Sequence, residues 1–107
     1  MKKIEAIIRK EKLERVKMLL ATLGYKGLTM ADVSGMGLQP KLGSKDRQKE
    51  LPKMKIELVV NDEDVSQVLS AIVRGAKTGG TGDGNIFIIP IENMIRVRTG
   101  DSGINAI

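Results

Sequence analysis

The chain has 107 residues, of which 41% are apolar and 29% charged, a balance typical of one small globular domain. It contains no cysteine and no histidine, which excludes a thiolate nucleophile, a disulfide, a histidine base and the usual zinc site. The net charge of +5 favours anionic partners, but one Phe, one Tyr and no Trp leave little surface for stacking nucleic-acid bases. We therefore expect a phosphate-bearing small ligand and no nucleic acid.

The apolar segments are short. The longest, residues 86–91, contains Pro90 and cannot span a bilayer. Charged residues recur throughout the N-terminal segment, so it lacks the apolar region of a secretory signal. We expect a cytoplasmic protein without direct membrane insertion.

Two periodicities follow one another at the start of the chain. Residues 3–9 alternate between apolar and charged side chains, which predicts a half-buried strand. Residues 11–23 carry apolar side chains at intervals of three and four, which predicts an amphipathic helix with Gly24 as its C-terminal stop. Residues 28–34 return to an extended pattern, and we expect this second strand to end before Gly35 and Gly37.

Apolar periodicity disappears between residues 36 and 52, which predicts a long exposed loop. Loops of this length in small domains are usually functional or disordered. Residues 54–60 then alternate as a strand, and Asn61 is expected to cap a helix with acidic residues 62–64 in its first turn. The expected buried face of that helix consists of Val65, Val68, Leu69, Ile72 and Ala76.

The segment KTGGTGDG, residues 77–84, is a glycine-dense loop that can wrap an anion. Its spacing fits neither the dinucleotide fingerprint nor the P-loop. A strand at residues 86–89 follows, which we expect to be buried on both faces and to end at Pro90. In an extended segment, Arg96 and Arg98 would point to one face and grip one anion, with Ile95 and Val97 facing inward.

The predicted order, strand, helix, strand, strand, helix, strand, indicates an α+β ferredoxin-like βαββαβ sandwich with both helices on one face of the sheet. The opposite face would expose apolar residues such as Ile7 and Val59. We therefore expect a homo-oligomer.

Several segments closely resemble the PII nitrogen-regulatory signal-transduction proteins: MKKIEAII, ELPKMKIELVV, TGxxGDGxIF, IRVRTG and the closing AI. The resemblance covers nearly the whole chain, as a single domain of residues 1–107. It implies a homotrimer that binds ATP or ADP in clefts between subunits, and a sensor rather than an enzyme. An extended T-loop, about 36–52, would contact a transporter or metabolic enzyme. The B-loop would span about 77–85, and the C-terminal segment about 96–107.

The resemblance also assigns residues to the nucleotide cleft. Gln39 would hold Mg²⁺ together with nucleotide phosphates, and Gln39 and Lys53 would meet 2-oxoglutarate. Glycine amides and guanidinium groups suit phosphate oxygens, which agrees with these roles. The nucleotide-binding residues would be Thr29 near the adenine, Gly35 and Gly37 at the T-loop base, Gly82, Asp83 and Gly84 in the B-loop, and Arg96 and Arg98 on the phosphates.

Two departures from the family pattern affect phosphate binding. Leu38 stands where the family usually has an arginine, and Asn85 where it has a lysine. Each lost cation removes a charge-assisted hydrogen bond of about 1.5 to 3 kcal/mol. This favours an alternative reading, a PII-like sensor of AMP, ADP or cyclic AMP that regulates a transporter and does not respond to 2-oxoglutarate.

Further departures lie in the T-loop. It is expected to be about five residues shorter than usual, and it contains no tyrosine, because the sole tyrosine is Tyr25. Uridylylation of a loop tyrosine is therefore excluded, while Ser44 offers a hydroxyl. Pro40 and Lys41 change the loop entry, which leaves 2-oxoglutarate binding open.

Two other functional classes share this topology. An RNA-binding domain would need aromatic residues on neighbouring central strands, and Phe87 alone does not supply them. An acylphosphatase would need a glycine-containing loop before the first helix, where this chain has residues 9–11, Arg-Lys-Glu. Both classes are disfavoured.

Overall fold

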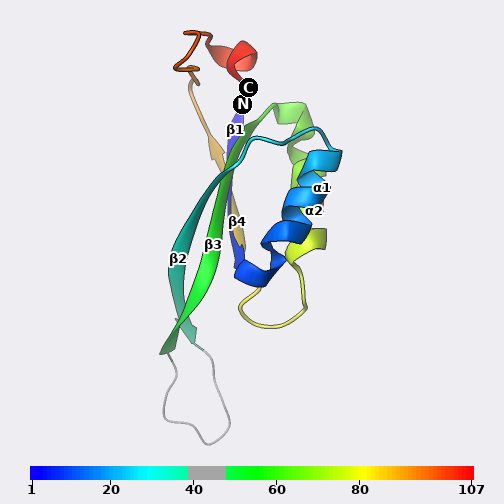
Figure 1. Cartoon of the computed structure of the whole chain (residues 1–107), viewed down its shortest axis with the longest axis vertical. Helices are drawn as coiled ribbons and strands as arrows, with labels where there is room; N and C mark the ends of the chain where they lie inside the picture. The colour runs from blue at the N-terminus through cyan, green and yellow to red at the C-terminus, as the bar shows by residue number, and fades with distance from the viewer. Residues whose placement is uncertain (39–47) are drawn as a thin grey trace, which may run out of the picture.

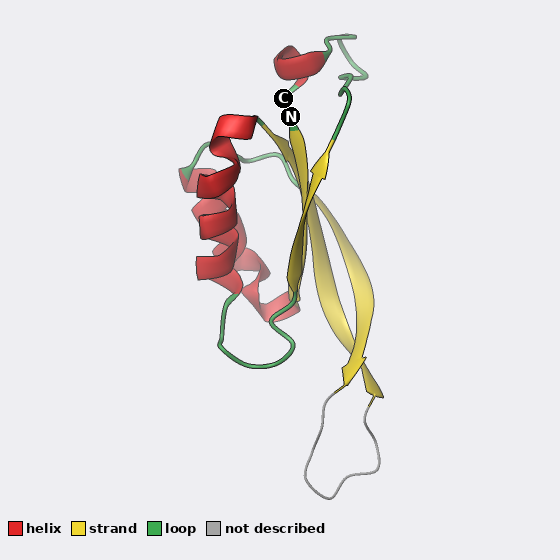
Figure 2. Cartoon of the chain, turned by 180° about the vertical axis from the view of Figure 1, so that it is seen from behind, coloured by secondary structure: helices red, strands yellow, loops and turns green. Residues whose placement is uncertain are grey.

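The computed structural model describes residues 1–38 and 48–107, and shows one four-stranded sheet with two helices on one face (Figures 1 and 2). All strand pairs are antiparallel, in the order β2-β3-β1-β4. The expected ferredoxin-like fold is thereby confirmed. The elements are β1 (Lys2–Arg9), η1 (Lys10–Lys12), α1 (Leu13–Thr22), β2 (Thr29–Leu38), β3 (Gln48–Val60), η2 (Asp62–Asp64), α2 (Val65–Ala76), β4 (Asn85–Pro90) and η3 (Gly103–Ala106).

The core lies between the sheet and the helices. Alternate residues of β1 and β3 point toward α1 and α2, because successive strand side chains face opposite sides. Complete burial of such a side chain contributes about 1.5 to 3 kcal/mol. The largest fully buried side chains are Ile4, Ile8, Val16, Leu20, Ile56, Val60, Val68 and Ile72.

The helix ends follow the sequence in one case and depart from it in the other. Gly24, with φ +96°, ends the first helix as expected, and the N–H of Tyr25 closes the turn on the carbonyl of Leu20. Asn61 does not cap through its side chain. Its backbone carbonyl accepts from Asp64 N, while its Oδ1 is buried without a partner among the described residues.

The β2–β3 hairpin is longer than predicted. Strand β2 continues through Gly35 and Gly37, which pair with Leu51 and Lys49, so the predicted loop at 36–52 is wrong at both ends. Beyond the Arg9–Lys53 pair, β3 has only β2 as a neighbour. A proline such as Pro52 is tolerated there, because that edge requires no N–H. The predictions for Gln39, Pro40, Lys41 and Ser44 lie outside the described residues.

Strand β4 is an edge strand and is not buried on both faces, contrary to prediction. It pairs with β1 alone, and Phe87, Ile88 and Ile89 are 45%, 47% and 37% exposed. Only Ile86 packs partly against the core. Pro90 ends the strand opposite Lys2, as expected.

Register places the two ends of β4 at opposite ends of the sheet. Asn85 pairs with Ile7, and Pro90 pairs with Lys2. The loop before β4 therefore lies at one end of the sheet, and the segment after it lies at the other, beside the N-terminus (Figure 1). No helix in the described part of the chain is long and apolar enough to cross a membrane.

Candidate functional site

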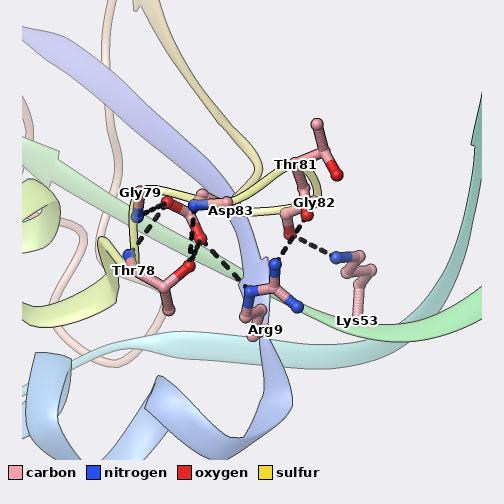
Figure 3. A network of polar contacts seen from close by, with 8 residues as sticks. Arg9, Lys53, Thr78, Gly79, Thr81, Gly82 and Asp83 are labelled. Atoms are coloured by element: carbon pink, nitrogen blue, oxygen red, sulfur yellow. Dashed lines mark hydrogen bonds and ion pairs between the residues drawn. The ribbon is translucent and has the colours of Figure 1, made fainter. Parts of the chain in front are cut away.

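Residues 77–84 form a loop organised around the Asp83 carboxylate (Figure 3). The carboxylate accepts hydrogen bonds from the backbone N–H groups of Thr78, at 2.9 Å, and Gly79, at 2.8 Å, and from the Thr78 hydroxyl. These bonds, with a contribution from Arg9, hold the Asp83 pKa far below its usual range. The carboxylate therefore stays ionised and fixes the start of the loop to its end.

Two cations hold the loop from the side of the sheet. Arg9, the last residue of β1, pairs with Lys53 of β3, and this is the last pair between the two strands. Arg9 Nε lies 3.2 Å from Asp83 Oδ1, and Arg9 Nη2 donates to the carbonyl of Thr81 at 2.6 Å. Lys53 Nζ donates to the carbonyl of Gly82 (Figure 3). The sequence prediction missed Arg9 here, although the alternation of residues 3–9 marks it as the last residue of a strand.

The predicted loop glycines meet a steric requirement. Gly82 and Gly84 have φ of +95° and +103°, which side chains rarely adopt. A Cβ on Gly84 would lie 1.7 Å from the carbonyl oxygen of Ile7, so the loop approaches β1 too closely for any side chain. A Cβ on Gly35 would lie 3.2 Å from Lys53 Cγ, so the C-terminal half of β2 packs closely against the same lysine.

These groups surround an open cleft of about 510 Å³. Backbone of the loop lines one side, and the β2–β3 hairpin lines the other through Gly35, Met36 and Leu51. Lys53 lines the cleft although it is only 8% exposed, so its charge is sheltered from water. Asn85 also lines the cleft and adds no cation.

Thr29 lies elsewhere, opposite Glu57 at the other end of β2. It lines a second cleft, of about 320 Å³, with Gly27, Val59 and Met94. Glu57 in that cleft is bound by Lys3 at 3.0 Å and Lys55 at 3.3 Å. These contacts lower the pKa of Glu57.

Arg96 and Arg98 do not lie on an extended segment, contrary to prediction. Residues 97–99 form a turn, closed by the Gly100 N–H on the Arg96 carbonyl at 2.7 Å, and Gly100 has φ +76°. Val97 is 99% exposed and does not face inward. Arg96 Nη2 donates to the carbonyls of Ala106, at 3.2 Å, and Ile107, at 3.3 Å.

The predicted site residues therefore do not form one group. Gly35, Gly82, Asp83, Gly84 and Lys53 come together in the 510 Å³ cleft, and the backbone of Gly37 continues the same hairpin. Arg96 and Arg98 follow the opposite end of β4, roughly 17 Å away along its six residues, while Thr29 starts β2 at the level of Glu57 and Glu5, apart from both. One chain does not bring the arginines to the glycine loop.

Comparison with known proteins identifies the family. The family model "Nitrogen regulatory protein P-II" matches residues 1–101. This chain belongs to the PII family. Nitrogen regulatory protein P-II 2 of Methanothermobacter thermautotrophicus is 48% identical over 100% of this chain and 97% of its own length. The P-II protein of Nostoc punctiforme is 44% identical over the full length of both.

A solved structure agrees with the sequence matches. The Arabidopsis thaliana PII bound to citrate superposes with a TM-score of 0.84 at 40% identity, covering 98% of this chain and 90% of the other. This PII protein thus shares both sequence and fold with nitrogen-regulatory signal transducers, which are regulators and not enzymes. Proteins of the family respond to small-molecule effectors and act on target proteins.

Proposed function

We propose that this PII protein binds ATP or ADP in clefts between subunits and reports the bound nucleotide to a partner protein through its T-loop. The observation that carries the proposal is the division of the candidate site: the glycine loop lies at one end of the sheet and Arg96 and Arg98 at the other, and groups of both kinds suit phosphate oxygens. A second subunit would supply the missing half.

The glycine loop suits the phosphates. Its backbone is held in a single conformation by Arg9, Lys53 and Asp83, so the amides need no reordering when an anion arrives. Arg98 of a neighbouring subunit would supply a guanidinium fork, and Arg96 would join it by leaving the C-terminal carbonyls. Thr29 and its cleft would receive the adenine.

The open face of the sheet supports assembly into a homotrimer. Ile7 and Val59 lie half-buried on this face, beside a row of ion pairs that joins Lys3, Glu57, Lys55 and Glu5. A face that mixes paired charges with apolar side chains suits burial against copies of itself. A trimer would have three times the 11.7 kDa mass of one chain.

The regulatory output is proposed to run through the T-loop. Strands β2 and β3 both line the glycine-loop cleft and both lead into residues 39–47, so a ligand there contacts the base of the T-loop directly. The T-loop would have two conformations, and ATP and ADP would differ in their relative affinities for them. The bound nucleotide would thereby determine whether the partner transporter or enzyme is bound. Gln39 would hold Mg²⁺ with the phosphates, and the protein would work in the cytoplasm. Alignments with relatives run over 112 positions against 107 residues here, and the proposal places this difference in the T-loop.

A second candidate function is a sensor of AMP, ADP or cyclic AMP that ignores 2-oxoglutarate. The observation that favours it is the state of Lys53, the residue proposed to meet 2-oxoglutarate. The residue is only 8% exposed, and its ammonium group donates to the Gly82 carbonyl. Binding 2-oxoglutarate would require breaking that bond. Asn85 in place of a lysine further weakens the contacts to a terminal phosphate.

Calorimetry with ATP, ADP, AMP and cyclic AMP, each with and without Mg²⁺ and 2-oxoglutarate, tests both candidates. If the leading proposal is right, ATP or ADP should bind with micromolar affinity, and Mg²⁺ should raise the affinity for ATP. If the second candidate is right, AMP, ADP or cyclic AMP should bind more tightly than ATP, and 2-oxoglutarate should not change nucleotide binding. Absence of any adenine-nucleotide binding below the millimolar range would contradict both.

A further inference from the structure

Arg9 occupies a position that no other cation in the described part of the chain shares: it contacts both the carboxylate and a carbonyl of the glycine loop. Its guanidinium reaches Asp83 Oδ1 and the Thr81 carbonyl with different nitrogens. A Cβ on Gly82 would lie 3.2 Å from Arg9 Nη2, so the loop backbone rests directly on the guanidinium. Arg9 and Asp83 side chains are only 25% and 24% exposed.

The two carbonyls held by the cations fix the direction of the amides that follow them. In a trans peptide the C=O and the N–H of the same plane point in opposite directions, and the described backbone has no cis bond. Because Arg9 and Lys53 draw the carbonyls of Thr81 and Gly82 toward the sheet, the N–H groups of Gly82 and Asp83 point away from it. Hydrogen bonds among the described residues leave both N–H groups without an acceptor.

Arg9 also acts on charge. Asp83 is an ionised carboxylate inside a loop proposed to bind phosphate, and two like charges a few ångströms apart repel strongly where water is partly excluded. The ion pair with Arg9 compensates that carboxylate. Lys53, by contrast, contacts the loop through the Gly82 carbonyl.

From this geometry we propose that Arg9 is a positioning residue of the anion site: it turns the Gly82 amide outward, beside the Asp83 amide that Lys53 orients, and it neutralises Asp83, so that a polyphosphate can bind. This inference rests on the proposed nucleotide function. A positioning role for Arg9 predicts an effect that a purely structural role would not produce. Loss of Arg9 leaves the Asp83 charge uncompensated, so the loss of ligand affinity must grow with the negative charge on the ligand.

The test measures AMP, ADP, ATP and inorganic tripolyphosphate binding by calorimetry for wild type and Arg9→Ala. We expect ATP affinity to fall about tenfold or more, ADP affinity less, and AMP affinity least. Arg9→Lys should recover part of the loss, because an ammonium keeps the charge but does not fork between two acceptors. Arg15→Ala, an exposed arginine on α1, is the matched control and should bind like wild type.

Adding Asp83→Asn to Arg9→Ala removes the carboxylate that Arg9 compensates. The double variant should therefore lose the dependence on ligand charge. Unchanged ATP binding in Arg9→Ala, or an equal loss for AMP, ADP and ATP, would overturn the inference. If Arg9→Ala does not fold, as judged by circular dichroism, the same comparison of ATP with AMP is made with Arg9→Lys.

Failure of the inference can be separated from failure of the nucleotide proposal. If wild type binds tripolyphosphate in an Arg9-dependent manner but binds no nucleotide, the role of Arg9 stands and the nucleotide proposal fails. If wild type binds nucleotides and Arg9→Ala binds them equally well, only the inference fails. Wild type that binds neither probe contradicts both.

Discussion

The two ends of the sheet carry the two halves of the proposed site, and a single chain fixes them to very different degrees. At the glycine-loop end, Arg9 and Lys53 fix the loop carbonyls while Asp83 fixes its amides. At the C-terminal end, residues 97–99 form an exposed turn, and the Arg96 side chain donates to the carbonyls of Ala106 and Ile107.

This difference indicates that the two halves would contribute to ligand binding in different ways. The glycine loop is already organised, so a phosphate binds there without ordering the backbone. The C-terminal arginines would gain defined positions only against a neighbouring subunit or a ligand. Changes at the first end should therefore affect folding and binding together, whereas changes at the second should affect binding alone.

The largest expected effect is that of Gly84→Ala. The new Cβ would lie 1.7 Å from the Ile7 carbonyl oxygen at a φ of +103°, so either the loop or β1 must move. We expect the free energy of unfolding to fall by about 3 kcal/mol, from overpacking and backbone strain combined. Urea denaturation followed by circular dichroism, at one protomer concentration, measures this change.

Gly27→Ala is the control for that experiment, because Gly27 has no positive φ and nothing within 4 Å of the added Cβ. Its stability should stay within about 1 kcal/mol of wild type. Equal stability of the two variants would show that the glycine loop is less constrained than its geometry indicates.

An intermediate effect is expected for Arg98→Ala, which tests the less organised end. Nucleotide affinity should fall about tenfold, because one charge-assisted hydrogen bond is lost. The free energy of unfolding should change by less than about 0.5 kcal/mol, since the residue lies in an exposed turn. Calorimetry and urea denaturation measure the two quantities, with Arg15→Ala as a control for loss of an exposed arginine. A stability loss without a loss of affinity would remove Arg98 from the site.

The smallest expected effect concerns Tyr25, whose hydroxyl donates to Asp64 beside the start of α2. Burial, followed by the bond and the charge of Asp64, raises its pKa to about 12, against about 10 in an unfolded chain. The stabilisation by this contact is therefore complete below pH about 10 and is lost as the pH rises through about 12. At neutral pH the hydrogen bond itself contributes only about 1 kcal/mol.

Absorbance at 295 nm follows phenolate formation at a single residue, because the chain has one tyrosine. The folded protein should titrate near pH 12 and the urea-unfolded protein near pH 10. Tyr25→Phe should remove the signal and the alkaline loss of stability. A folded-state midpoint near pH 10 would mean that the contact with Asp64 does not persist in solution.

Local patterns in the sequence predicted most of the fold. Strand β1, the apolar stripe of α2 and the stop at Gly24 depend on periodicity and on one residue's conformational freedom. The extension of the β2–β3 hairpin was missed, because glycines normally end strands and only the pairing with Leu51 and Lys49 keeps Gly35 and Gly37 in one. The turn at residues 97–99 was missed for a related reason, since Ile95 and Val97 fit an alternating pattern but are 64% and 99% exposed in the described structure.

The sequence by itself determined the α+β topology, the family and the glycines of the loop, because these depend on near-neighbour patterns that one chain carries in order. Tertiary structure decided where those residues meet. The antiparallel pairing of β1 with β3 and β4 placed Arg9 and Lys53 under the glycine loop and sent Arg96 and Arg98 to the opposite end. Register is a long-range property of paired backbones, so spacing along the chain does not reveal it.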